Sequence, residues 1–151
     1  MTVNIQFPAV AESLSQLSIS GVNVFDVDTI PADASRSCPA LYPAPAGFIT
    51  DLEFVLQSFG NDANRKIDIA YTLNYRFLYA PIGSGSLLQN YAGLIDKLAI
   101  IIEKILSNST PDGAVNMDLL GVSNIGAMMD EAGQTMYHGV DIALRVLEFA
   151  Q

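Results

Sequence analysis

Apolar and polar positions alternate along this chain with two different periods, which separate the predicted strands from the predicted helices. Between Lys66 and Tyr79 the odd positions are Ile, Ile, Tyr, Leu, Tyr, Phe and Tyr, whereas the even positions are mostly polar or small. This period of two predicts an unusually long β-strand. Phe48–Gln57 alternates in the same way, and the turn-forming residues Gly60–Asn64 lie between the two segments. Together they predict an antiparallel hairpin.

The apolar period changes to three or four residues after a break at Pro81–Gly85, and this predicts an amphipathic helix over Ser86–Asn108. Ser86 precedes Gln89 by three residues, which is the spacing of a capping box, and Pro111 follows the predicted end. The apolar face of this helix is broad. We therefore expect the helix to be buried on more than one side.

Weaker patterns at the two ends of the chain complete the predicted fold. Apolar residues at helical spacing predict a short helix over Pro8–Leu17, and Val22–Val27 favours a strand. Val115–Leu120 predicts a short strand, Gly121–Ala132 is ambiguous, and Gln134–Phe149 predicts a long strand. The predicted fold class is α+β: a mainly antiparallel sheet with a long β-hairpin, packed against one long amphipathic helix plus a short N-terminal helix.

The stretch from Asp28 to Gly47 has no apolar period and contains four of the seven prolines. Repeated proline disfavours both a helix and a central strand. The stretch also carries Ile30, Leu41 and Tyr42, so it is more apolar than a solvated linker. We predict a single domain over residues 1–151, with 28–47 as an extended arm that docks on a partner such as a neighbouring subunit.

Composition adds a reason to expect assembly. The chain is 50% hydrophobic and 15% charged, whereas an average domain is about 25% charged. This excess of apolar residues excludes intrinsic disorder and suggests that some apolar surface is buried against other chains. The sequence contains no apolar run typical of a membrane helix and no basic segment typical of a signal peptide. We expect no membrane contact and an origin in the cytoplasm.

The charge is strongly acidic, with seven basic and sixteen acidic residues and a net charge of −9. Proteins that neutralise phosphates need clustered Lys and Arg, so ordinary nucleic-acid binding is not expected. An acidic wall along which DNA passes without binding stays open, because like charges repel.

Residues typical of catalysis or metal binding are sparse. Cys38 and His138 are the only cysteine and histidine, so the sequence predicts no disulfide within the chain and no metal cluster. The turn Gly83–Ser86 lacks the lysine of a phosphate-binding loop, and the acidic stretch Asp26–Asp33 lacks the spacing of a calcium loop. We predict a protein that is not an enzyme, with no catalytic, cofactor-binding or metal-binding residues.

The candidate functional residues are therefore contact residues. Three tyrosines share one face of the long predicted strand, and this pattern favours packing in the core or in an interface. Apolar residues of the arm and a pair of methionines in the ambiguous segment have the same character. The predicted contact residues are Ile30, Leu41, Tyr42, Tyr71, Tyr75, Tyr79, Met128 and Met129.

The order of the elements resembles that of the tail terminator proteins of long-tailed bacteriophages. The strand Ile67–Tyr79, the helix Ser86–Asn108 and the closing stretch His138–Val146 carry the resemblance. It implies an α+β subunit of a hexameric ring that caps the tail tube, ends its polymerisation and joins the tail to the head connector. The arm at 28–47 is longer than the resemblance leads us to expect.

The resemblance also implies partners and a location. These are the tail tube protein, a head–tail connector or neck protein, and DNA that passes without specific binding. The location would be the head-proximal end of the virion tail, after assembly in the host cytoplasm. One alternative is another neck or tail-completion protein. An alternative from a different class is a small-ligand-binding or enzymatic α+β domain that uses the tyrosine-bearing sheet face and the turn Gly83–Ser86.

Overall fold

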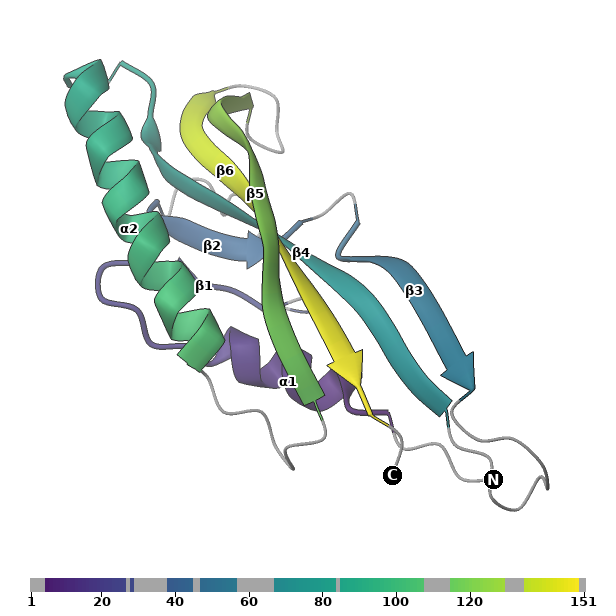
Figure 1. Cartoon of the computed structure of the whole chain (residues 1–151). Coiled ribbons are helices and arrows are strands. Elements are labelled where there is room, and N and C mark those ends of the chain that lie inside the picture. Colours follow the sequence, from purple (N-terminus) through teal and green to yellow (C-terminus); the bar gives the residue numbers. More distant parts are fainter. Residues whose placement is uncertain are drawn as a thin grey trace.

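The computed structural model describes residues 5–26, 28, 38–44, 47–56, 67–83, 85–107, 115–129 and 135–149. These residues have an α+β fold with two helices and six strands (Figure 1). In chain order the elements are α1 (Phe7–Ser15), β1 (Asn23–Val24), β2 (Ala40–Pro43), β3 (Ile49–Leu56), β4 (Ile67–Pro81), α2 (Leu87–Ser107), β5 (Val115–Met129) and β6 (Met136–Glu148). The predicted fold class is confirmed.

Five of the six strands follow one another in the order β1-β2-β4-β6-β5, and β3 also pairs with β4. β1 and β2 are parallel, and the other pairs are antiparallel. β2 pairs with residues 75–78 of β4 and β3 with residues 67–73, so the two short strands follow one another along the same side of β4. The half of the sheet near the start of β4 therefore has the order β3-β4-β6-β5.

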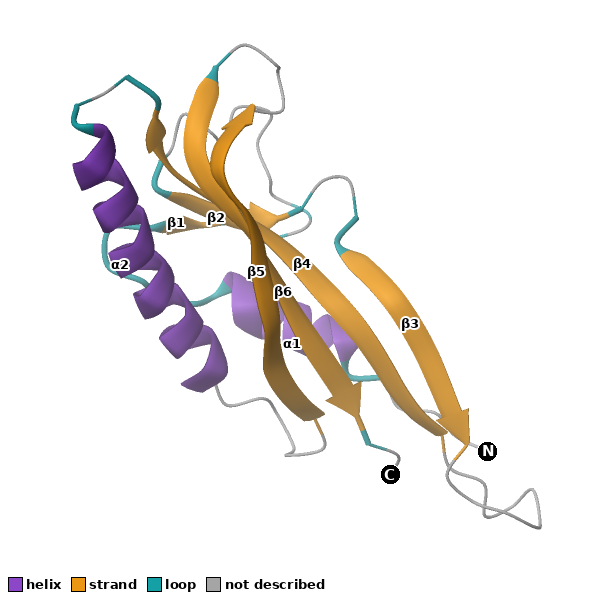
Figure 2. Ribbon diagram, turned by 45° about the horizontal axis from the view of Figure 1, so that its top comes forward, coloured by secondary structure: helices purple, strands orange, loops and turns teal. Residues whose placement is uncertain are grey.

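The alternation of β4 and β6 explains where the core lies. The odd positions of β4 and the even positions of β6 point to the same face, and both helices pack on it. Figure 2 shows α1 behind the strands and α2 running beside them. The buried core contains Val10, Leu14, Ile19, Leu41, Ile69, Tyr71, Leu73, Tyr75, Phe77, Leu94, Leu98, Ile101, Ile105, Val140, Ile142, Leu144 and Val146.

The strongest sequence patterns gave the right elements. β3 and β4 form the predicted antiparallel hairpin, and α2 begins one residue after Ser86, whose Oγ accepts a hydrogen bond from the backbone N–H of Gln89 at 3.4 Å. None of the described helices is long and apolar enough to cross a membrane.

β5 is longer than its sequence suggests. The predicted short strand 115–120 and the ambiguous segment after it form one strand of 15 residues that ends at Met129. Its pairing with β6 shifts between Leu119 and Gly121 and again between Ser123 and Gly126. These irregularities interrupt the alternation, which is why the segment does not read as a strand.

The predicted arm needs a correction. Within it, Ala40–Pro43 forms β2, a strand of this subunit's own sheet whose four residues are all buried. Pro43 is the last residue of β2, a position where the missing N–H interrupts little of the hydrogen-bond ladder. Ala40 and Tyr42 join Leu78 in a small second cluster, separate from the main core. The predicted contact residue Ile30 lies outside the described residues.

Candidate functional site

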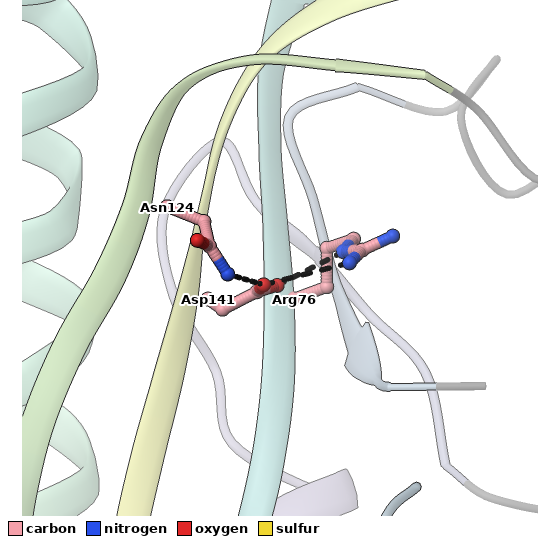
Figure 3. Close-up of polar contacts among 3 residues, drawn as sticks. All are labelled: Arg76, Asn124 and Asp141. Carbon is pink, nitrogen blue, oxygen red and sulfur yellow. Dashed lines mark hydrogen bonds and ion pairs between the residues drawn. The ribbon is translucent and has the colours of Figure 1, made fainter. Parts of the chain in front are cut away.

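A row of polar side chains crosses the sheet on the face away from the helices (Figure 3). Arg76 of β4 and Asp141 of β6 are cross-strand neighbours, and Arg76 Nε lies 2.9 Å from Asp141 Oδ1. Asn124 of β5 donates from Nδ2 to the other carboxylate oxygen at 2.9 Å. The backbone of Asn124 has a φ of +55°, a conformation that asparagine tolerates better than most residues. The row joins the three strands and holds the charge of Arg76 at a carboxylate.

A second arginine on this face binds β3 to the sheet. Arg145 Nη1 donates to Thr72 Oγ1 at 3.0 Å and to the backbone oxygen of Asp51 at 2.8 Å, and Nη2 lies 3.6 Å from a carboxylate oxygen of Glu53. Asp51 has a φ of +53° and lies where the pairing of β3 with β4 shifts. Asn74 adds a bond to Thr50 Oγ1 at 2.9 Å. These contacts fix β3 along the side of β4.

The one histidine lies in the subunit interior. His138 of β6 is 1% exposed, and its ring packs edge-on against Tyr91 of α2 with a centroid distance of 5.2 Å. Neither ring nitrogen has a hydrogen-bond partner among the described residues. A catalytic histidine needs an oriented partner, and here the ring fixes the first turns of α2 to the sheet.

Cys38 and Asp26 have local structural contacts. Burial raises the pKa of the Cys38 thiol to about 11, which disfavours the reactive thiolate. Asp26 accepts a hydrogen bond from the backbone N–H of Asp28 at 2.9 Å, which is a local turn contact. Across the described residues, no group of three or more His, Cys, Asp and Glu side chains is placed to hold a metal ion.

A buried carboxylate connects the two ends of the described chain. Glu148 of β6 is 2% exposed. Its Oε1 accepts a hydrogen bond from the backbone N–H of Gln6 at 2.5 Å, and its Oε2 accepts one from the Tyr71 hydroxyl at 2.6 Å. Burial and the neighbouring Glu148 carboxylate raise the pKa of Tyr71. The contact secures the segment before α1 against the end of β6.

An apolar stripe, exposed except at the partly buried Ile102, follows the length of α2. Its members are spaced alternately by four and three residues, as in a helix that packs along a second element. Leu88 is 79% exposed, Ile95 53% and Leu106 44%. We call this set the helix stripe; it comprises Leu88, Ala92, Ile95, Ala99, Ile102 and Leu106.

Two contacts show which way the helix stripe faces. Lys97 Nζ donates to the backbone oxygen of Ser20 at 2.9 Å, so that flank of α2 lies toward the segment between α1 and β1. Ile102 lies on the other side of the buried face and packs, partly buried, on the core, as do Val115 and Met117 of β5. The helix stripe therefore lies on the flank directed toward β5.

A second apolar surface lies at the opposite edge of the sheet from β5, beside β3. Leu52 is 54% exposed, Phe54 63% and Ile49 40%, and Ile5 is 53% exposed next to them. We call these four residues the β3 patch. Together with Phe7, Ile69 and Tyr71 they line an open pocket of about 160 Å³. The patch lies on the helix side of the sheet, because Phe54 pairs with Ile69 and Ile49 with Leu73, both of the core.

The predicted contact residues are mostly core residues. Leu41, Tyr42, Tyr71 and Tyr75 are each at most 3% exposed, and Met128 is 8% exposed. Their side chains support this subunit's own packing and offer no surface to a partner. Tyr79 is partly buried, and Met129, at 46%, is exposed at the end of β5. The tyrosine-bearing face of β4 is thus the core side of the sheet.

Sequence reasoning missed the helix stripe and the β3 patch as surfaces, although both leave a signal. The 4-3-4-3-4 spacing from Leu88 to Leu106 is visible in the sequence, and Leu52 and Phe54 occupy the apolar positions of the first hairpin strand. The period of the apolar residues does not show which apolar faces the chain covers with its own elements and which it leaves exposed. No protein-family model matches the sequence, and a search of curated proteins finds no match.

Proposed function

We propose that this chain is a structural subunit of a phage tail that assembles into a ring, as a tail terminator does. The observation that carries the proposal is the presence of two different exposed apolar surfaces at opposite edges of one sheet. The helix stripe lies on the β5 side, and the β3 patch lies on the β3 side. When two different patches of identical subunits meet head to tail, the contacts repeat and close into a ring if the rotation allows it.

The layout of the elements supports the tail terminator in particular. The long hairpin, the single long helix and the long closing strand are the features on which the resemblance rests, and the described residues contain all three. In this proposal the ring has six members, caps the tail tube, ends its polymerisation and meets a head–tail connector or neck protein. Another neck or tail-completion protein is the nearest alternative.

The charges are consistent with DNA passing through such a ring. A ring of six copies would carry −54. On the sheet face away from the helices, Arg76 is paired with Asp141 and Arg145 with Glu53, so neither arginine presents an uncompensated charge to a phosphate. At these two positions the face offers no unpaired cation of the kind that neutralises phosphates in nucleic-acid binding.

Native mass spectrometry of the purified chain tests the proposal, with electron micrographs to show the shape of the particle. We expect a closed ring, formed by the chain alone or on addition of the tail tube protein. A protein that stays monomeric at high concentration with and without tube protein contradicts the proposal. Thermal stabilisation by a metabolite, with no effect of tube protein, would instead support a ligand-binding or enzymatic domain.

A further inference from the structure

The two edge strands of this part of the sheet, β3 and β5, lie in the same cross-strand rows. One cross-strand row runs from Phe54 of β3 through Ile69 and Glu148 to Val115 of β5. A second row runs from Ile49 through Leu73 and Leu144 to Leu119. Within the described residues β3 pairs only with β4, and β5 only with β6. Each strand therefore has one side on which a further strand can pair.

The directions of the two edge strands suit each other. β3 is antiparallel to β4, β4 to β6 and β6 to β5, so β3 and β5 run in opposite directions. A neighbouring copy rotated about an axis along the strands keeps these directions. Its β3 would therefore lie antiparallel to β5 of the first copy, the arrangement that strand addition between proteins uses.

The regular part of β5 spans the same cross-strand rows as residues 49–54 of β3. β5 is regular from Val115 to Leu119, and its pairing with β6 first shifts after Leu119. The row of Leu119 is also the row of Ile49, where β3 begins. Beyond this level the other side of β4 is occupied by β2 and β1, which would collide with a straight continuation of a neighbour's β5. A bulged strand bends at such a point.

This placement would bring the helix stripe of one copy onto the β3 patch of the next. Tyr91 packs on His138, which fixes the start of α2 at the cross-strand row of His138. Leu106 lies about 22 Å further along the helix at ~1.5 Å per residue, and Leu144 lies about 20 Å along β6 at ~3.3 Å per residue. Because α2 and β6 descend in the same direction (Figure 1), Leu106 lies near the level of the row that ends at Ile49.

We infer that β5 of one copy pairs with β3 of the next, while the lower part of the helix stripe covers the β3 patch. The inference rests on the proposed ring and names its contact: Ile102 and Leu106 of one subunit lie against Ile49 and Leu52 of its neighbour. Both surfaces are apolar, and Leu106, Ile49 and Leu52 are each at least 40% exposed in the isolated subunit. The contact completes the helix layer over a part of the sheet that the chain itself leaves bare.

Two matched substitutions on α2 test this contact. Leu106 is 44% exposed on the helix stripe, and Ile100 is 43% exposed on the flank that carries Asp96 and Lys104. Leu106→Glu and Leu52→Glu are expected to shift the ring to monomer in native mass spectrometry, with circular dichroism unchanged. Ile100→Glu is expected to leave the ring intact. A ring that survives Leu106→Glu overturns the inference.

Disulfide trapping gives a second, independent readout. In a Cys38→Ser background, Leu52→Cys with Leu106→Cys is expected to give covalent multimers up to the full ring under mild oxidation. Leu52→Cys with Ile100→Cys is expected to give none. Multimers from Leu106→Cys alone would show helix-to-helix contacts, and a ring without the Leu52–Leu106 bridge would show another interface. Either result overturns the proposed contact but leaves the proposed ring intact. A wild-type chain that never assembles contradicts the ring and the contact together.

Discussion

Replacing Tyr71 by Phe tests the buried tie between the two ends of the described chain. The substitution keeps the ring and removes only the hydroxyl, which donates to Glu148 at 2.6 Å where both residues are 2% exposed. A hydrogen bond to a charged group contributes about 1.5–3 kcal/mol. The remaining described donor to the carboxylate is the Gln6 N–H at 2.5 Å. We expect Tyr71→Phe to lower the free energy of unfolding by about 2 kcal/mol, roughly a 30-fold change in the equilibrium constant.

Urea denaturation followed by circular dichroism measures this loss, at one fixed protein concentration because assembly also stabilises the folded chain. We expect the midpoint to fall while the slope stays unchanged. Tyr79→Phe is the control, since Tyr79 faces the same side of β4 and is only partly buried. A Tyr71→Phe variant within about 0.5 kcal/mol of wild type, the range typical of surface substitutions, would refute the assigned role of Glu148.

Three further predictions follow from burial, close packing and titration. Ile101→Asp is expected to abolish folding, measured by circular dichroism, because Ile101 is fully buried and the new carboxylate would have no partner there. Gly139→Ala is expected to destabilise the chain by about 1–3 kcal/mol in urea denaturation, because its Cβ would lie 2.7 Å from Leu78 Cδ2 and 2.9 Å from the Phe77 carbonyl oxygen. Burial raises the pKa of Cys38 from 9.0 to about 11, so its contribution to stability is present below pH 9 and is lost as the pH rises toward 11; the pH dependence of unfolding in Cys38→Ser is expected to lack this component.

Sequence periodicity predicted the elements that bury one regular face. β4, β6 and α2 each present a continuous apolar face to the core, so their periods of two and 3.6 survive intact in the sequence. β2 was missed because its four residues stand among prolines and are buried on both faces, which leaves no alternation to detect. β5 was only half predicted because two shifts in pairing interrupt its alternation.

The candidate contact residues show a limit of a different kind. Tyr71, Tyr75 and Tyr79 were correctly placed on one face of a strand, but the sequence does not say which apolar face the chain's own helices cover. In the fold α1 and α2 cover that face and leave part of the β3 side bare. Surfaces for a partner are what remains after the subunit has covered itself, and that remainder depends on tertiary structure.

The position of β6 has a consequence for how the chain reaches its fold. β6 is the last of the described strands in sequence, yet it lies between β4 and β5 and pairs with both along nearly its whole length. Before β6 pairs, β4 and β5 each present the strand edge that β6 will occupy, and the two edges match the same strand in register. A β6 from another copy can pair with these two edges as well as the chain's own β6 can. Refolding at high protein concentration is therefore expected to produce strand-exchanged dimers in competition with subunits that pair their own β6.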